Sequence, residues 1–158
     1  MADKQRFELF ARLLVSRFEA APRIYDIAGG RGLLNEALTR LGRTVTTFDQ
    51  RHKHVEVRYA LRPFTLDEPC ECDLVVGMHP DGATRLIIEY AARHSLPFAV
   101  VPCCSDNGLP YKPWMRHLAG LARSLRFARV EEALLPMQGR ARVLIGEPPA
   151  GPPLDAER

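Results

Sequence analysis

Apolar residues recur along this chain with two different periods, and the two kinds of segment alternate. Residues 3–19 carry Phe7, Phe10, Leu14 and Phe18 at three- and four-residue steps, which predicts an amphipathic helix that ends before Pro22. Short runs rich in apolar or β-branched residues predict buried strands at 23–27, 44–48, 73–77 and 97–101. Helices are expected between them, at 33–41, 83–94 and about 113–125.

The remaining segments complete the layout of one sheet. Residues 55–59 alternate in polarity and predict a third, edge-like strand, and 127–135 with 141–145 predict an antiparallel pair that turns at Gln138-Gly139. Strands that alternate with helices at this spacing imply a parallel sheet covered on both faces. The expected fold class is therefore α/β, with a doubly wound, mostly parallel, Rossmann-like sheet and a terminal antiparallel strand pair.

Length and composition indicate one globular domain. The chain has 158 residues, of which 46% are hydrophobic and 26% charged, so residues 1–146 are expected to form a single packed domain. The Pro-rich residues 147–158 are expected to be a disordered tail. No apolar run of membrane-spanning length occurs and the first residues are charged, so we expect no membrane partner, no secretory signal and a cytoplasmic location.

The four cysteines do not predict a metal site. Cys70 and Cys72 precede one predicted strand, whereas Cys103 and Cys104 follow its expected parallel neighbour. A five-residue strand spans about 16 Å at ~3.3 Å per residue, which separates the two pairs. One tetrahedral zinc ion needs all its sulfur ligands about 2.3 Å away, so neither a shared metal nor a disulfide between the pairs is expected.

The most informative segment is the run Asp26-Ile27-Ala28-Gly29-Gly30-Arg31-Gly32, between a predicted strand and a predicted helix. Glycines there allow positive φ and a close approach of the backbone to a ligand. A dinucleotide-binding loop has the pattern G-x-G-x-x-G, but from Gly30 the third glycine position holds Asn35. The carboxylate of Asp26 is unfavourable beside a pyrophosphate and suits a ligand that carries an ammonium group.

A second acidic residue, Asp49, ends the second strand about twenty residues beyond the loop. A carboxylate at that position can accept hydrogen bonds from ribose hydroxyls, which both classes of nucleoside cofactor provide. The alternative is that Asp49 simply forms the turn at the end of the strand.

The glycine segment resembles motif I of class I S-adenosylmethionine-dependent methyltransferases, (D/E)-x-(G/A)-x-G-x-G, with Ala28 at its first small position. The resemblance implies the class I methyltransferase fold and S-adenosylmethionine as the cofactor, with Asp26 ordering the loop and helping to hold the methionine end. The cofactor-binding residues expected from the loop and the neighbouring strand ends are Asp26, Ala28, Gly29, Gly30, Gly32, Asp49, Gln50, Met78 and His79.

A narrower resemblance covers about residues 22–104. The run from Gly77 to Gly82 has the form G-x-H-x-x-G, and Pro102-Cys103-Cys104 ends the next strand. This pair of motifs is similar to the methyltransferase domain of the tRNA uridine 2′-O-methyltransferase family and its methyltransferase-like relatives, which often have Ala-Cys where this chain has Pro80-Asp81. The resemblance implies methylation of RNA, either tRNA or rRNA.

Three side chains at these strand ends are candidate catalytic residues. His79 has a side chain that titrates near neutral pH and can accept a hydroxyl proton, or it can be a structural hydrogen-bonding residue. Cys103 or Cys104 can attack a pyrimidine ring as a nucleophile, or line the acceptor pocket. The Asn-Pro-Pro-Tyr motif of amino-group methyltransferases is absent, which argues against an exocyclic amine as the acceptor.

The formal net charge of +3 is compatible with RNA but does not require it. Basic residues expected near the cofactor edge are Arg51, Lys53, Arg58, Lys112 and Arg116, with Tyr111 and Trp114 as stacking aromatics. The alternative is a solvated helix face with Trp114 in the core. Other functions left open are a small-molecule or protein methyltransferase, a NAD-dependent oxidoreductase and a non-catalytic S-adenosylmethionine-binding module.

Overall fold

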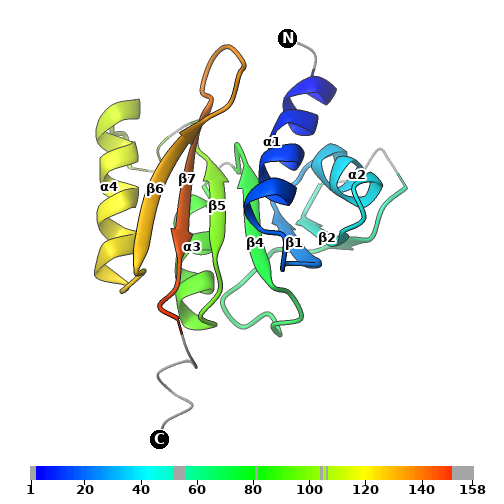
Figure 1. Ribbon diagram of the computed structural model, residues 1–158, viewed down its shortest axis with the longest axis horizontal. Helices are drawn as coiled ribbons and strands as arrows, with labels where there is room; N and C mark the ends of the chain where they lie inside the picture. The colour runs from blue at the N-terminus through cyan, green and yellow to red at the C-terminus, as the bar shows by residue number, and fades with distance from the viewer. Residues whose placement is uncertain (1–2, 52–55, 81, 104, 106, 151–158) are drawn as a thin grey trace, which may run out of the picture.

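Within residues 3–51, 56–80, 82–103, 105 and 107–150, which the computed structural model describes, seven strands form one sheet in the order β3-β2-β1-β4-β5-β7-β6 (Figure 1). The strands are β1 (Arg23–Ile27), β2 (Thr44–Asp49), β3 (Tyr59–Leu61), β4 (Leu74–Met78), β5 (Phe98–Val101), β6 (Arg129–Leu134) and β7 (Arg142–Glu147). The helices are α1 (Asp3–Arg17), α2 (Leu33–Arg40), α3 (Thr84–Arg93) and α4 (Tyr111–Ser124).

The first five strands run parallel, and the last two form the predicted antiparallel pair. β7 pairs antiparallel with both β5 and β6. The chain builds the sheet outward from β1 in one direction and from β4 in the other, so the strand order reverses between β1 and β4. In open α/β sheets ligands bind beyond the carboxyl ends of the strands at this reversal. The doubly wound fold expected from the sequence is confirmed.

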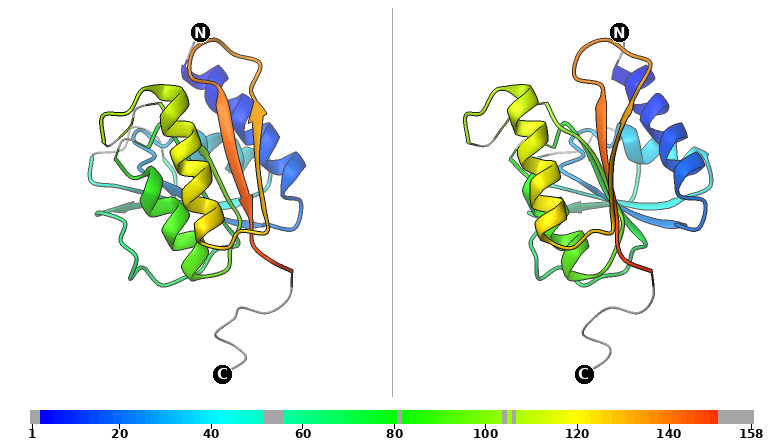
Figure 2. Two further views of the ribbon diagram at one scale, coloured as in Figure 1. Left: turned by 90° about the vertical axis from the view of Figure 1, so that its left-hand side faces the viewer. Right: turned by 60° about the vertical axis from the view of Figure 1, so that its left-hand side comes forward.

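Helices cover both faces of the sheet, α1 and α2 on one side and α3 and α4 on the other (Figure 2). The predicted apolar stripe of α1 is buried, with Phe10, Leu14 and Phe18 packed in the core that α1 shares with α2. Alternation along the strands assigns each residue to a face. Along β4, Leu74, Val76 and Met78 face the α1 side, whereas Val75 faces the α3 side.

Several predicted boundaries move by one or two residues, and the edge strand moves further. The edge strand is β3, residues 59–61, rather than 55–59, and residues 52–55 lie outside the described part of the chain. Two successive parallel strands need a connection that runs back along the sheet, usually of a dozen residues or more. The connection from β2 to β3 is shorter than that, and only three residues of β3 pair with β2. Helix α4 begins at Tyr111, two residues before Pro113, because proline is accepted in the first turn where its missing N–H is not needed.

The cysteine placement agrees with the predicted separation. Cys72 lies two residues before β4 and Cys103 two residues after β5, and these two strands are parallel neighbours, so the two thiols lie near opposite ends of the strands. Cys104 lies outside the described residues. Among the residues described, no group of three or more His, Cys, Asp or Glu side chains is placed to hold a metal ion. In the same part of the chain, no helix combines the length and apolar character needed to cross a membrane.

Candidate functional site

The loop between β1 and α2 has three residues in left-handed conformations, which turn the backbone sharply away from the sheet. Ala28, Gly30 and Gly32 have φ angles of 54°, 55° and 87°. An L-residue pays about 1–2 kcal/mol for this conformation, so Ala28 is strained where the two glycines are not. The loop therefore changes direction sharply at the carboxyl end of β1.

Gly29 lies directly against the side chains beneath the loop. A Cβ atom at this position would be 2.6 Å from the Cγ2 atom of Thr47 and 2.7 Å from the Cγ atom of Asp26. Real Cβ atoms essentially never approach other atoms this closely. Glycine is thus required here by close packing of the loop onto β1 and β2.

Asp26 supports the loop from inside the protein. Its side chain is 1% exposed, its Oδ2 atom accepts a hydrogen bond of 2.8 Å from the Thr47 hydroxyl, and its Oδ1 atom has no hydrogen-bond partner among the described residues. Asn35 extends the network by donating to the Thr47 hydroxyl over 3.0 Å. Burial raises the pKa of Asp26 to about 7. Its predicted role at the methionine end of a cofactor stays a prediction.

Asp49 binds the same loop from β2. Its Oδ2 atom accepts a hydrogen bond of 2.7 Å from the N–H of Gly30, and its Oδ1 atom accepts one of 3.0 Å from the N–H of Arg51. The guanidinium of Arg51 lies 3.4 Å from Oδ1. Burial opposes ionisation of Asp49, but these donors outweigh it, and its pKa is lowered. Asp49 is therefore a fixed carboxylate beside the glycine loop.

Tyr59 on β3 hydrogen-bonds to the loop, a contact that the sequence analysis missed. Its hydroxyl oxygen lies 2.6 Å from the carbonyl oxygen of Gly30 and 3.0 Å from that of Arg51. Burial and the charges of Asp49 and Asp26 raise the pKa of Tyr59 to about 12, so it stays a hydroxyl donor. The peptide unit around Gly30 is thus held by Asp49 through its N–H and by Tyr59 through its carbonyl.

Two hollows meet over this loop, and Ala28 and Arg51 belong to both. The α1-side hollow has a volume of about 330 Å³, and the α3-side hollow about 400 Å³. The α1-side hollow is lined by Arg6, Phe7, Ala28, Gly29, Gly30, Arg31, Leu33, Arg51, Met78 and His79. The α3-side hollow is lined by Ile27, Ala28, Phe48, Asp49, Gln50, Arg51, Pro63, Phe64, Pro80, Gly82, Ala83 and Leu86.

Most of the predicted cofactor residues are brought together here. Ala28, Gly29, Gly30, Met78 and His79 line the first hollow, and Asp49 and Gln50 line the second. Asp26 lies beneath the loop, and Gly32 is buried as the N-cap of α2.

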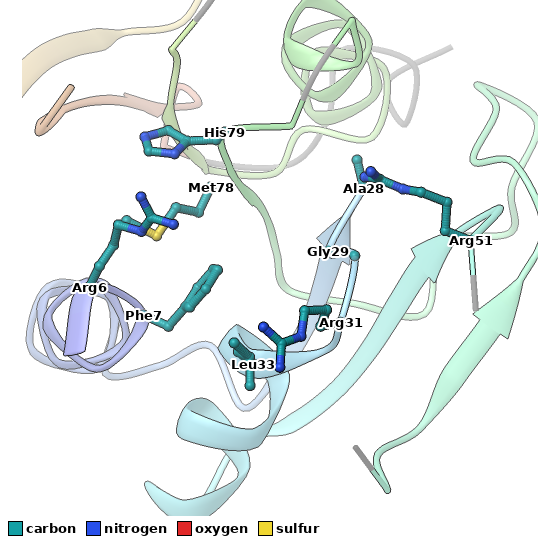
Figure 3. Close-up of a pocket in the computed structure, with 10 residues that line it drawn as sticks. Arg6, Phe7, Ala28, Gly29, Arg31, Leu33, Arg51, Met78 and His79 are labelled. Atoms are coloured by element: carbon teal, nitrogen blue, oxygen red, sulfur yellow. The ribbon is translucent and has the colours of Figure 1, made fainter. Parts of the chain in front are cut away.

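The wall formed by α1 is a part of the site that the sequence analysis did not foresee. Figure 3 shows Arg6 and Phe7 reaching from α1 toward Met78 and His79, with Arg31 on the loop side of the same hollow. The three-and-four periodicity assigned Phe7 to the core face of the helix. It gave no sign that the end of this helix lies beside the end of β4.

His79 directly follows β4 and has an unusual backbone. Its φ angle is 49°, its N–H donates to the carbonyl of Val101 over 2.8 Å, and its Nε2 atom lies 3.2 Å from the carbonyl oxygen of Arg140. A carbonyl only accepts hydrogen bonds, so Nε2 is the protonated nitrogen in this contact. The guanidinium of Arg140 in turn lies 4.1 Å from the ring centroid of Tyr111, which ties the β6–β7 turn to the start of α4.

The other predicted site residues are less well placed. Cys103 is partly buried after β5 and is not among the residues that line either hollow, and Cys104 lies outside the described residues. Of the predicted RNA-contacting residues, Arg51 borders both hollows. Arg58 lines a separate depression beside α2, and Lys53 lies outside the described residues.

The late helix contributes exposed charge but no free indole. Lys112 and Arg116 are exposed on α4. Trp114 is 1% exposed and its ring stacks on His117 with centroids 5.5 Å apart. The use of Trp114 as a stacking surface for RNA is therefore wrong, because the indole is part of the core under α4.

Comparison with known proteins bears on the fold. No protein-family model matches the sequence, and no curated protein matches it either. Among solved structures, the Burkholderia thailandensis 1,6-didemethyltoxoflavin-N1-methyltransferase with bound S-adenosylhomocysteine superposes with a TM-score of 0.62 at 18% identity, covering 91% of this chain and 77% of that one. The chain has the class I methyltransferase fold.

Two other solved structures superpose on the chain to a similar extent. Streptomyces venezuelae DesVI gives a TM-score of 0.64 at 12% identity, with 92% of each chain covered. Human N-acetylserotonin methyltransferase in complex with S-adenosylmethionine gives 0.59 at 17% identity, covering 93% of this chain and 52% of that one. None of these three belongs by its name to the tRNA uridine 2′-O-methyltransferase family, so that narrower resemblance stays a prediction.

The glycine loop and the start of α2 differ at one position, Asn35, from a dinucleotide-binding loop. Asn35 occupies the position of the third glycine of the dinucleotide pattern, and it is fully buried. Its amide donates to the carbonyl of Val45 over 3.2 Å and to that of Arg58 over 3.0 Å, in addition to the Thr47 hydroxyl. The position that glycine keeps empty in dinucleotide folds is thus filled by a side chain that joins α2 to β2.

Proposed function

We propose that this chain is a methyltransferase that uses S-adenosylmethionine. The observation that carries the proposal is the ionised carboxylate of Asp49, which lines the α3-side hollow and accepts a hydrogen bond from the N–H of Gly30. A carboxylate fixed at the end of the second strand is suited to bind ribose hydroxyls. The bound S-adenosylhomocysteine and S-adenosylmethionine of the structural neighbours support the choice of cofactor.

The two hollows suit the two ends of an adenosyl amino acid. The α3-side hollow offers apolar walls from Phe48, Phe64 and Leu86, which suit a purine ring, and Gln50 supplies a polar group. The α1-side hollow offers the bent loop at Ala28 and Gly30 for the amino-acid end. The buried Oδ1 atom of Asp26, which lacks a hydrogen-bond partner among the described residues, fits a ligand with an ammonium group above the loop.

A dinucleotide fits this site less well. The ionised carboxylate of Asp49 lies beside the loop, and a negative charge so placed opposes a pyrophosphate. The side chain of Asn35 also fills the position that the dinucleotide pattern leaves to glycine. Both features favour a cofactor without phosphate.

In the proposed reaction S-adenosylmethionine supplies a methyl group on a sulfonium, and the chain orients the acceptor and removes its proton. Alignment accounts for much of the rate of such an in-line transfer. His79 is the proposed base for an acceptor hydroxyl, because its Nε2–H donates to Arg140 and leaves Nδ1 as the basic nitrogen of the neutral ring. The proton would pass to His79 as the methyl carbon bonds to the acceptor oxygen and its bond to the sulfonium sulfur breaks, which leaves S-adenosylhomocysteine.

Two classes of acceptor are proposed, and each has its own support. RNA is the class that the sequence predicted, and Arg51, Lys112 and Arg116 supply exposed positive charge for it. A small molecule is supported by the limited volume of the α1-side hollow and by the structural neighbours, whose names refer to 1,6-didemethyltoxoflavin and N-acetylserotonin. Transfer of radiolabel from S-adenosylmethionine to a total tRNA and rRNA pool, compared with transfer to a low-molecular-mass extract, separates the two.

Calorimetry with S-adenosylhomocysteine, NAD and ATP tests the cofactor. We expect S-adenosylhomocysteine to bind and the other two to bind far more weakly. Asp49→Asn keeps the size of the side chain but removes its charge, and should weaken S-adenosylhomocysteine binding by roughly 1–3 kcal/mol. Asp73→Asn is the matched control, because Asp73 pairs with Arg23 next to the opposite ends of the strands. Binding of NAD alone, or equal affinity in wild type and Asp49→Asn, would overturn the proposal.

A further inference from the structure

We propose that the acceptor of this site is an anion, a phosphate or carboxylate carried on an apolar ring, recognised by Arg6 and Arg31. The inference rests on the proposed function and specifies its substrate class. Its basis is the composition of the α1-side hollow, which has three arginines and no acidic residue among its ten lining residues.

The arginines occupy different walls of this hollow. Arg6 extends from α1 toward Met78 and His79, Arg31 comes from the glycine loop near Leu33, and Arg51 lies at the far end beside Ala28 (Figure 3). The charge of Arg51 is offset by its ion pair with Asp49. Arg31 has no ion pair within the described part of the chain, and its side chain is exposed.

The charge of the cofactor makes this composition informative. S-adenosylmethionine carries an ammonium, a carboxylate and a sulfonium, so its net charge is positive. The charges of its carboxylate and its ammonium sum to zero, so the sulfonium adds positive charge to a hollow that already has three arginines. A second anion in the same space relieves this repulsion, and the guanidinium group is suited to bind phosphate or carboxylate through two parallel hydrogen bonds. The acceptor is the remaining molecule that can supply it.

The rest of the wall indicates what carries the anion. Phe7, Leu33 and Met78 give the hollow an apolar floor between the arginines. An aromatic ring or a nucleobase can lie against such a surface while its anionic group reaches a guanidinium. His79 completes the hollow at the end of β4, where the reacting hydroxyl would be within its reach.

The test uses phenyl phosphate as the probe and benzyl alcohol as its neutral counterpart, titrated by calorimetry into the protein saturated with S-adenosylhomocysteine. We expect phenyl phosphate to bind at least ten-fold more tightly than benzyl alcohol. Arg6→Gln and Arg31→Gln should each weaken phenyl phosphate about ten-fold, with no change for benzyl alcohol. Arg12→Gln is the matched control, since Arg12 is exposed on α1 and does not line the hollow. Thermal melts of all variants check that the fold is retained.

Three outcomes are decisive. Equal binding of the two probes, with S-adenosylhomocysteine bound, overturns the inference and leaves the proposed function standing. A second outcome is that the variants lower the affinity for S-adenosylhomocysteine and leave unchanged the affinities for phenyl phosphate and for 5′-methylthioadenosine, which lacks the amino-acid end. In that case the arginines bind the cofactor carboxylate, and the inference also fails. Failure of S-adenosylhomocysteine to bind the wild-type protein is a failure of the proposed function itself.

The source of the anion is a separate arm of the experiment. In this arm a 20-nucleotide RNA competes with phenyl phosphate for the wild-type protein and for Arg31→Gln. If the RNA displaces phenyl phosphate from the wild type and does so less well from the variant, the inference holds with an RNA phosphate as the anion. If phenyl phosphate stays bound in the presence of that RNA, the inference holds with a small anionic metabolite as the acceptor.

Discussion

Protonation of Asp26 should control how the stability of this protein varies with pH. The carboxyl group is 1% exposed beneath the glycine loop, and Thr47 supplies its one hydrogen bond among the described residues. Burial raises the pKa of Asp26 to about 7 in the folded protein, against about 3.9 in an unfolded chain. Asp26→Asn keeps the shape of the side chain and abolishes its titration.

The expected magnitude follows from the difference between the two pKa values. At about 1.36 kcal/mol for each pKa unit, a difference of about three corresponds to about 4 kcal/mol. The sign is set by the folded state, which binds the proton more tightly than the unfolded chain. The stabilisation by protonated Asp26 is therefore fully present below about pH 4, is lost as the pH rises toward 7, and stays lost above it.

Urea unfolding of wild type and Asp26→Asn across pH 4.5–8 measures this effect. The free energy of unfolding of the wild type, minus that of the variant, should fall by roughly 3–4 kcal/mol over this range. Taking the difference cancels the other titrating groups. Asp73→Asn is the control without a change over this range, because a hydrogen bond from Arg23 lowers the pKa of Asp73 and its contribution is lost only below about pH 4. A wild-type-minus-Asp26→Asn difference that changes by less than about 1 kcal/mol would refute a buried, protonated Asp26.

Two further substitutions probe the loop itself. Tyr59→Phe removes the hydroxyl that donates to the carbonyl oxygens of Gly30 and Arg51. Calorimetry should show S-adenosylhomocysteine binding weakened by about 0.5–1.5 kcal/mol. Unchanged affinity would show that Tyr59 does not contribute to the site. Gly29→Ala introduces a Cβ atom 2.6 Å from Thr47 Cγ2, and is expected to lower the free energy of urea unfolding by about 1–3 kcal/mol, whereas a stability equal to wild type would show that the loop can move away.

The parts of the fold that depend on local composition could be predicted from the sequence. The strands β1, β4 and β5 are buried on both faces, so their sequences are nearly continuously apolar and differ clearly from the alternating pattern of half-exposed strands. The terminal hairpin and the glycine loop were equally visible, because a turn or a left-handed backbone restricts which residues occur there. The same reasoning identified Asp49, since it lies where a buried strand ends.

What the sequence could not supply are contacts between residues far apart in the chain. The hydroxyl of Tyr59 reaches Gly30 across 29 positions, and the ring of His79 reaches the Arg140 carbonyl across 61. No periodicity encodes such pairs, because they depend on how the sheet edge and the β6–β7 turn fold back over the strand ends. Arg6 was missed for the same reason, since the role of a helix end is set by the strand it lies beside.

Backbone strain concentrates where the proposed chemistry would occur. Among the described residues, four non-glycine positions have positive φ, and two of them, Ser95 and Arg126, follow helices, where a left-handed residue is the ordinary way to end. The other two, Ala28 and His79, directly follow the neighbouring strands β1 and β4 and both line the α1-side hollow. Glycine at position 79 would avoid about 1–2 kcal/mol of backbone strain but would lose the ring to which the proposed proton transfer is assigned.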